Sequence, residues 1–382
     1  MGNTRIRITT DYAKATYAFQ NDTIGYGGWW WLRSPCYLYT NGVRYVYFHG
    51  SATEVTSSNN KSGGIVPALT ISLSPESGED NSTSQIDDGF VFIQGGTVVG
   101  SDDYNQYETG VFPAGRTVIL SNFYMSDHEV TQGEYTVVMG ENPSGFSSNP
   151  ASGEIQANRP VENVSWYDAI YFCNKKSIAE GLTPCYSVEG NTEPTKWNYI
   201  PHNGNDINGT ISCDFNANGY RLPTEAEWEF AARGGMETYG KAAFSNYFAG
   251  ASTTDCSAYI NSDLDSVGWY VYNICNNGVT SSSEPNSSES GFGTHEVKKK
   301  LPNALGLYDM SGNVWEWSWD WYDSIDSGTV SDPCGVSSGS VRIRRGGGWG
   351  DDAICSSVSF RIYYDPYYRY SSGGFRLVRS AR

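Results

Sequence analysis

Four short blocks rich in glycine and tryptophan constrain the fold of this chain more than any other feature. They are residues 219–229 (GYRLPTEAEWE), 302–317 (PNALGLYDMSGNVWEW), 344–349 (RRGGGW) and 374–378 (GFRLV). Glycines and large aromatic residues at such short intervals favour turns and short strands that pack through their rings. The 382 residues include 43 glycines, 28 tyrosines and 12 tryptophans, so we expect a loop-rich domain in which helix is the minority.

Two helices can be placed from local signals. Thr224 and Glu227 form a capping box in front of the run WEFAAR, and the glycine pair at 234–235 ends this helix. Ser165 is placed to cap a second helix over residues 165–173, where apolar residues recur at helical spacing.

Strand patterns occur at the start of the same region and in its second block. Residues 90–93 and 117–120 are rich in β-branched and aromatic residues and predict a hairpin that enters a larger domain. Trp315 and Trp317 fall on one face of an extended segment and Glu316 on the other. Two packing tryptophans are therefore expected, with one carboxylate left to find a partner.

A polar, acidic segment divides the chain. Residues 74–88 (SPESGEDNSTSQIDD) are predicted to be a linker. Residues 1–73 form a small β-rich module with strands at 44–48 and 64–69, and residues 89–382 form the larger domain. Within the latter, the low-complexity segment 281–290 is expected to be an exposed loop.

Charge and cysteine content exclude several classes of function. The net charge is -17 and the pI about 4.6, which disfavours nucleic acid and anionic membrane as partners. No run approaches the roughly 18 apolar residues of a spanning helix. The eight cysteines contain no C-x-x-C pair, so no thiolate zinc site is expected, and disulfides or buried thiols both remain open.

In their order and separation, the four blocks resemble the formylglycine-generating enzyme (sulfatase-modifying factor) family. Residues 129–131 and 160–166 extend the resemblance, which covers about residues 89–382. It implies an α+β architecture: the C-type lectin fold of formylglycine-generating-enzyme type, irregular, sheet-centred and loop-rich, with two main helices.

The same resemblance implies a possible structural calcium ion, although no cofactor is required. In the enzymes that the chain resembles, calcium is held by oxygens at the positions of Asp309, Gly312, Val314 and Glu316, and hard oxygen ligands suit this ion. A glutamate that accepts backbone amides would look identical in sequence, so that alternative stays open.

The resemblance also provides a test for catalysis. The family's enzymes bind copper with two cysteines, and paired thiolates are what Cu(I) requires. Here those positions fall at about Asp351 and Ser356, and Cys355 alone cannot provide a two-thiolate site. We therefore expect that the chain is not an enzyme and that Cys355 is a buried packing residue.

The block at about residues 346–378 instead has the composition of a binding surface. Tyrosine offers large amphipathic contact area, while serine, glycine and aspartate offer adaptable hydrogen bonds. The block resembles the variable region of proteins diversified by retroelements, especially the surface-displayed variable proteins of spirochaetes. In such proteins the adenines of AAC codons are copied into random bases, which yields Tyr, Asp, Ser, Ile, Val, Phe and Gly.

This second resemblance indicates which residues would bind ligand and which would stay constant, and Trp349 belongs to both sets. The predicted ligand-binding residues are Trp349, Asp351, Asp352, Ile354, Phe360, Ile362, Tyr363, Tyr364, Asp365, Tyr367, Tyr368, Tyr370, Ser371 and Ser372. The predicted unvarying scaffold comprises Trp349, Ala353, Arg361, Pro366, Arg369 and the Gly-Phe-Arg sequence at 374–376.

Taken together, the sequence predicts a non-catalytic binding protein, displayed at the cell surface or secreted, with any signal or anchor outside the given sequence. Its ligand is expected to be a protein, and the chain a monomer. An inert structural domain and a copper-dependent oxidase are the alternatives. Residues 27–35 (GGWWWLRSP) resemble the Trp-Trp-Leu-Arg-Ser-Pro modules of bacterial surface proteins, which either dock on the main domain or bind a ligand themselves.

Overall fold

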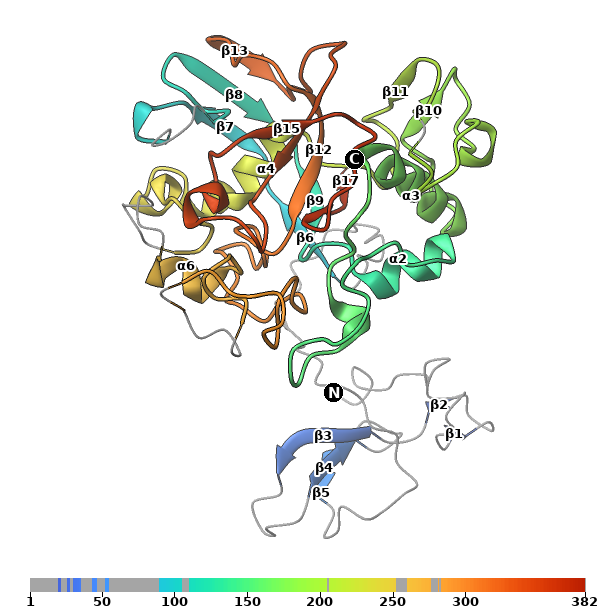
Figure 1. Cartoon of the computed structure of the whole chain (residues 1–382), viewed down its shortest axis with the longest axis vertical. Coiled ribbons are helices and arrows are strands. Elements are labelled where there is room, and N and C mark those ends of the chain that lie inside the picture. The colour runs from blue at the N-terminus through green and yellow to red at the C-terminus, as the bar shows by residue number, and fades with distance from the viewer. Residues whose placement is uncertain are drawn as a thin grey trace. The chain divides into compact units, whose positions relative to one another are not determined.

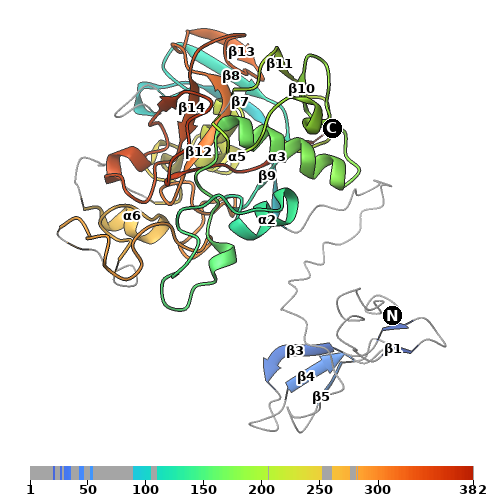
Figure 2. The same cartoon turned by 45° about the vertical axis from the view of Figure 1, so that its right-hand side comes forward.

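The chain separates into two compact units, residues 1–83 and 84–382, and each is described here by itself. The computed structural model describes residues 89–104, 110–204, 206–251, 260–275, 281 and 283–381, and the backbone of five strands before residue 89 (Figures 1 and 2). The predicted linker 74–88 lies outside the described residues.

The first unit contains two small antiparallel sheets. One pairs β1 (Gln20–Asn21) with β2 (Tyr26–Gly27), and the other has the order β3 (Trp30–Pro35), β4 (Val43–Val46), β5 (Ala52–Glu54). The WWLRSP motif therefore forms β3, with Trp31 opposite Tyr45 of β4. The strand predicted at 44–48 corresponds to β4, and the one predicted at 64–69 lies outside the described residues.

The second unit begins with four strands that pair in a nested order. β6 (Phe90–Ile93) pairs with β9 (Phe123–Ser126), whereas β7 (Gly96–Val99) pairs with β8 (Arg116–Leu120). The prediction that 90–93 and 117–120 form one hairpin was wrong, because the chain changes sheets at Gly95. A Cβ at that position would lie 2.1 Å from the carbonyl oxygen of Leu120, so only glycine allows this close backbone approach.

The end of the chain completes both of these sheets. β17 (Val378–Ser380) joins β9 on the side opposite β6, and β13 (Gly328–Ser331) lies parallel to β8. The first and last strands of the unit therefore belong to the same sheet, as Figure 1 shows.

A third sheet contains Trp315 and Trp317 together with part of the predicted variable block. Its order is β15 (Ile362–Tyr364), β14 (Arg342–Arg345), β12 (Trp315–Trp321), β16 (Gly373–Gly374). Trp317 faces α3 and donates its indole N–H to the carbonyl of Val164 at 2.9 Å, whereas Glu316 faces α4 and accepts from Trp228 at 2.7 Å. The expected alternation along this strand, with both tryptophans buried, is confirmed.

Both predicted helices are present and begin with the expected caps. α3 (Trp166–Ala179) is capped by Ser165 and α4 (Glu225–Ala232) by Thr224, each with a complete capping box. The first of these continues six residues beyond its predicted end. The other helices are α2 (Gln132–Met139), α5 (Gly235–Thr238) and α6 (Ser262–Val267). The remaining elements are the pair β10 (Tyr186–Val188) and β11 (Ile211–Cys213) and the 3-10 turns Asp102–Tyr104, Gln156–Asn158, Pro194–Lys196, Ala242–Ser245 and Ala353–Ser356.

Two aromatic-rich cores lie on either side of the third sheet, one beneath α3 and one beneath α4. Cys173, Cys185 and Cys275 are buried free thiols, which agrees with the packing interpretation for these three. Within the segment 281–290, residues 283, 284 and 286–290 are exposed, as predicted. None of the helices in the described part of the chain has the length and apolar character needed to cross a membrane.

Candidate recognition surface

Five tyrosines of the predicted variable block lie in β15 and in the loop that follows it, and we call Tyr363, Tyr364, Tyr367, Tyr368 and Tyr370 the tyrosine surface. Four of them are exposed, with exposed fractions of 49%, 42%, 37% and 51% for residues 363, 367, 368 and 370. Only Tyr364 is half-buried. Most of these rings are therefore available to another molecule.

The rings of the tyrosine surface support one another by stacking. Tyr364 and Tyr368 lie 4.8 Å apart between centroids at an angle of 14°, and Tyr368 and Tyr370 lie 6.1 Å apart at 21°. Tyr363 instead contacts Tyr322, which follows β12, at 4.3 Å. Because stacked rings restrict one another's rotation, the surface is ordered before any ligand binds.

The backbone beneath the tyrosine surface is held to the N-terminal end of α3. The carbonyl of Pro366 accepts from the amide of Trp166 at 2.9 Å, and the carbonyl of Tyr370 accepts from Asn163 at 3.0 Å. Between them, the Arg369 guanidinium donates to Asp168. Outward-facing tyrosines thus alternate with residues that bind the scaffold.

Two further arginines of the block are held by buried carboxylates. Arg361 donates to both oxygens of Glu225, at 2.6 and 2.9 Å, and Arg376 donates to both oxygens of Glu316, each at 2.6 Å. Bidentate pairs of this kind fix orientation as well as charge. The structure therefore places these arginines inside the scaffold, where exchange of the side chain would remove the bidentate partner of a buried carboxylate.

Arg344 is a feature of this site that sequence reasoning missed. Its buried guanidinium lies 4.0 Å from the ring centroid of Tyr364 and 5.0 Å from that of Trp317. Its Nε and Nη1 have no hydrogen-bond partner in the described part of the protein. Burial lowers the pKa of Arg344 to about 10. The alternating arginines of the sequence RIRR at 342–345 were the available signal.

Several predicted ligand-binding residues take part in the scaffold instead. Ser372 is only 4% exposed, so its placement on the surface was wrong; its carbonyl accepts from the amide of Trp315 and its side chain packs against Gly348. Asp351 accepts from the Trp315 indole at 2.8 Å and from the amide of Gly348 at 3.2 Å. Burial raises the pKa of Asp351.

The remaining predicted residues are half-buried at the edge of the block. The Trp349 ring packs edge-on against Phe146 and Phe292, with centroids 5.1 and 5.0 Å apart, and its indole donates to the carbonyl of Ser371. The others in this class are Asp352, Ile354, Phe360, Ile362, Asp365 and Ser371. Their side chains are therefore only partly accessible to a ligand.

Comparison with known proteins identifies the scaffold. Residues 76–381 match the model of the sulfatase-modifying factor enzyme 1-like domain. The chain belongs to this family. The predicted family and the predicted α+β, C-type lectin fold of formylglycine-generating-enzyme type are thereby confirmed.

Three known proteins illustrate what this chain is similar to, two of them over about three quarters of its length. The solved structure of Treponema denticola variable protein 1 is 38% identical with a TM-score of 0.61, covering 76% of this chain and 94% of that one. The chaperone protein LppX of Paenibacillus barcinonensis is 36% identical over 296 residues, 75% of this chain and 92% of that protein. A formylglycine-generating enzyme of Streptomyces coelicolor is 35% identical over 170 residues, 43% of this chain and 48% of the enzyme.

The copper chemistry of the sulfatase-modifying factor enzymes does not fit the side chains present here. Asp351 and Ser356, at the expected positions of the two cysteines, offer hard oxygens to a metal that prefers thiolates. The Asp351 carboxylate also already accepts from Trp315 and Gly348, and Ser356 is buried. We therefore derive no oxidation step for this chain.

The calcium ligands suggested by the family do not fit as a set either. Both oxygens of Glu316 accept from Arg376, and one also accepts from Trp228, so most of the acceptor capacity of this carboxylate is already used inside the protein. One oxygen of Asp309 accepts from the amide of Lys298, and the other has no partner. No cluster of three His, Cys, Asp or Glu side chains suited to a metal occurs among the described residues.

The residues that precede the sulfatase-modifying factor domain match a different family model. Residues 3–73 match a domain of unknown function, DUF6273. No activity follows from this match. The predicted boundaries at 73 and 88, and the choice between docking and independent binding, stay predictions.

Proposed function

We propose that this chain is a non-catalytic binding protein whose tyrosine surface recognises a ligand through side chains diversified by a retroelement. The observation that carries this proposal is the division of one short block into two sets. Four tyrosine rings point into solvent, whereas Arg361, Pro366 and Arg369 are held by the scaffold. Such a division allows side chains to change while the backbone stays in place.

Physical chemistry supports recognition of a protein by this surface. A tyrosine ring buries roughly 150–250 Å² and has few rotatable bonds, so contact through several rings gives affinity at low entropic cost. Stacking between Tyr364, Tyr368 and Tyr370 lowers that cost further by ordering the rings in advance. The ligand is taken to be a protein and the chain a monomer displayed at the cell surface or secreted.

Sequencing the 3′ end of the gene in closely related cells tests the diversification. We expect substitutions confined to adenine-derived codons, at the exposed positions 363, 367, 368 and 370 and at the half-buried position 364. The codons for Arg361, Pro366 and Arg369 are expected to stay constant. Uniform sequence across the block, or equal variation at inward and outward positions, would contradict the proposal and favour an inert structural domain.

An oxygen-consumption assay tests the absence of catalysis. The full chain is incubated with copper and a cysteine-containing sulfatase peptide, next to a formylglycine-generating enzyme as positive control. We expect no turnover, because Asp351 and Ser356 replace the thiolate pair. Conversion of the peptide cysteine would restore the oxidase alternative.

The surface location has its own test. Intact cells are treated with a protease, and the chain is followed with an antibody against residues 89–382. Loss of the signal without lysis supports display on the surface, and its recovery in the medium supports secretion. Protection until the cells are lysed would contradict both.

A further inference from the structure

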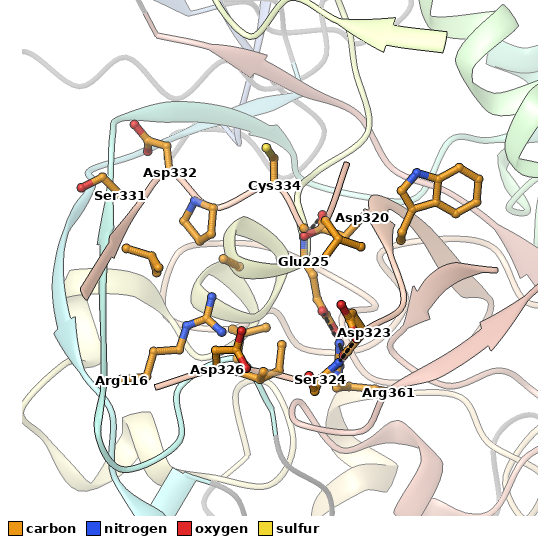
Figure 3. A pocket seen from close by; sticks show the side chains of 18 residues that line it. Arg116, Glu225, Asp320, Asp323, Ser324, Asp326, Ser331, Asp332, Cys334 and Arg361 are labelled. Carbon is orange, nitrogen blue, oxygen red and sulfur yellow. Dashed lines mark hydrogen bonds and ion pairs between the residues drawn. The ribbon is translucent and has the colours of Figure 1, made fainter. Parts of the chain in front are cut away.

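A second site, separate from the tyrosine surface, lies between β8, α4 and the segment that follows β12. It is a cavity of about 450 Å³, lined among others by Arg116, Glu225, Asp320 and Arg361, with Asp323 and Asp326 in the segment beyond β12 (Figure 3). This volume is within the range of roughly 300–1,000 Å³ that is typical of small-molecule sites.

Arg116 is the unusual member of this cavity. Its side chain is only 9% exposed, yet its Nε has no acceptor and no ion pair reaches it from any described residue. Figure 3 accordingly draws no dashed line to Arg116, whereas Arg361 is bonded to its neighbours. Burial lowers the pKa of Arg116. A buried guanidinium without a partner is costly, and a carboxylate is the group that complements it best.

The carboxylates on the floor and far wall of the cavity are already engaged. Glu225 is paired with Arg361, and Asp320 accepts from the amide of Glu225 at 2.8 Å. Burial raises the pKa of Asp320 to about 7, which reduces its negative charge. Asp332 accepts from the amide and hydroxyl of Ser121, each at 2.7 Å. An entering anion therefore meets less repulsion than the number of acids suggests.

At the mouth of the cavity, in contrast, one carboxylate is not engaged by other described residues. Asp326 is exposed there and has no hydrogen bond or ion pair with any residue whose position is described. Arg116 inside the cavity and Asp326 at its rim thus each lack a direct hydrogen bond or ion pair within the described residues, although the charges of Glu225, Asp320 and Asp326 act on Arg116 at longer range. Apolar side chains of Val111, Val330 and Val336 complete the lining.

We propose that this cavity binds a small zwitterion of the amino-acid type, with its carboxylate on Arg116, its ammonium group toward Asp326, and an apolar side chain against the valines. Each charged group of the ligand then meets a group of opposite sign that has no ion pair with another described residue. A neutral polyol would leave both charges uncompensated, and a simple anion or cation would compensate only one. The proposal does not depend on the tyrosine surface.

Ligand-observed NMR with the full chain tests this with three matched probes: L-valine, isovalerate, which lacks the ammonium group, and isobutylamine, which lacks the carboxylate. We expect saturable binding of L-valine with a Kd of about 1 mM or tighter, and binding of each analogue at least about tenfold weaker. Equal binding of isobutylamine and L-valine, or no saturation by L-valine, would overturn the proposal.

Substitutions of the lining residues test whether L-valine binds in this cavity. Arg116→Met and Asp326→Asn should each weaken L-valine at least about tenfold, since each removes one charge–charge contact. Tyr363→Ala, on the tyrosine surface, should leave binding unchanged. If Arg116→Met does not fold, Asp326→Asn and Val336→Trp decide the question, because both positions are exposed and the tryptophan obstructs the mouth. Undiminished binding in these two variants would contradict the site.

Discussion

Arg369 donates two hydrogen bonds to Asp168, from Nε to Oδ2 at 2.8 Å and from Nη2 to Oδ1 at 3.2 Å. The carboxylate is fully buried and also caps α3 through Ser165. Burial alone would raise the pKa of Asp168, but the bond from Arg369 and the charges of His202 and Arg369 lower it overall. One ion pair therefore joins the loop that carries the tyrosine surface to the start of a core helix.

Removing this arginine should destabilise the domain. Arg369→Met leaves Asp168 buried without its hydrogen-bonded guanidinium, and we expect a loss of about 3 kcal/mol in the free energy of unfolding, measured by chemical denaturation. The double variant with Asp168→Asn should recover part of that loss, since no unpaired charge remains. Equal stability of wild type and Arg369→Met would show that the pair does not hold the loop.

The exposed tyrosines should behave differently from the half-buried one. Tyr363→Ala, Tyr367→Ala and Tyr370→Ala should each change the free energy of unfolding by no more than about 0.5 kcal/mol. Tyr364→Ala should cost about 2 kcal/mol, because it uncovers Arg344 and removes a cation–π contact. Thermal denaturation of the four variants measures this. Large losses at all positions would favour the inert structural alternative.

Asp351 was predicted to contact ligand, but its bonds to Trp315 and Gly348 indicate a structural role. Asp351→Ala should reduce the free energy of unfolding by about 1–3 kcal/mol, because the indole N–H loses its acceptor. Its exposed-edge neighbour Asp352 is the matched control, and Asp352→Ala should cost less. A smaller loss for Asp351→Ala than for Asp352→Ala would contradict this assignment.

Glu162 should make the stability fall as pH rises toward neutral. Burial raises the pKa of Glu162 from 4.5 to about 7, so the folded state holds a proton that the unfolded state releases. The stabilisation is complete below about pH 4 and is lost as pH rises through about 7. Glu162→Gln should therefore be more stable than wild type above pH 7, by about 2 kcal/mol, with little difference at pH 4. Exposed Glu237→Gln is the control and should show no such dependence.

Removal of calcium by a chelator should not change the thermal stability of the domain. Because Arg376 and Trp228 occupy the oxygens of Glu316, we expect the same Tm in EDTA and in excess calcium, measured by scanning calorimetry. Glu316→Gln should lower the Tm under both conditions, since the buried guanidinium loses its counter-charge. A rise of several degrees with calcium would support the ion that the family resemblance implied.

Much of the scaffold was determined by the sequence itself, because local signals act over short distances. The caps at Ser165 and Thr224 and the alternation of Trp315, Glu316 and Trp317 depend on residues within one turn or one strand. The order and spacing of the glycine and tryptophan blocks along the chain were likewise sufficient to identify the family. The tyrosine-rich composition of residues 346–378 also predicted exposed rings, four of which the structure shows.

Only the tertiary structure decided which residues of that block face inward and which strands pair. Ser372 and Asp351 have the composition of a binding loop, yet both contact Trp315 from another part of the chain. The crossing at Gly95 and the unpaired charge of Arg116 likewise depend on neighbours distant in sequence. Side-chain type limits what a residue can bind, but long-range packing determines whether solvent or protein surrounds it.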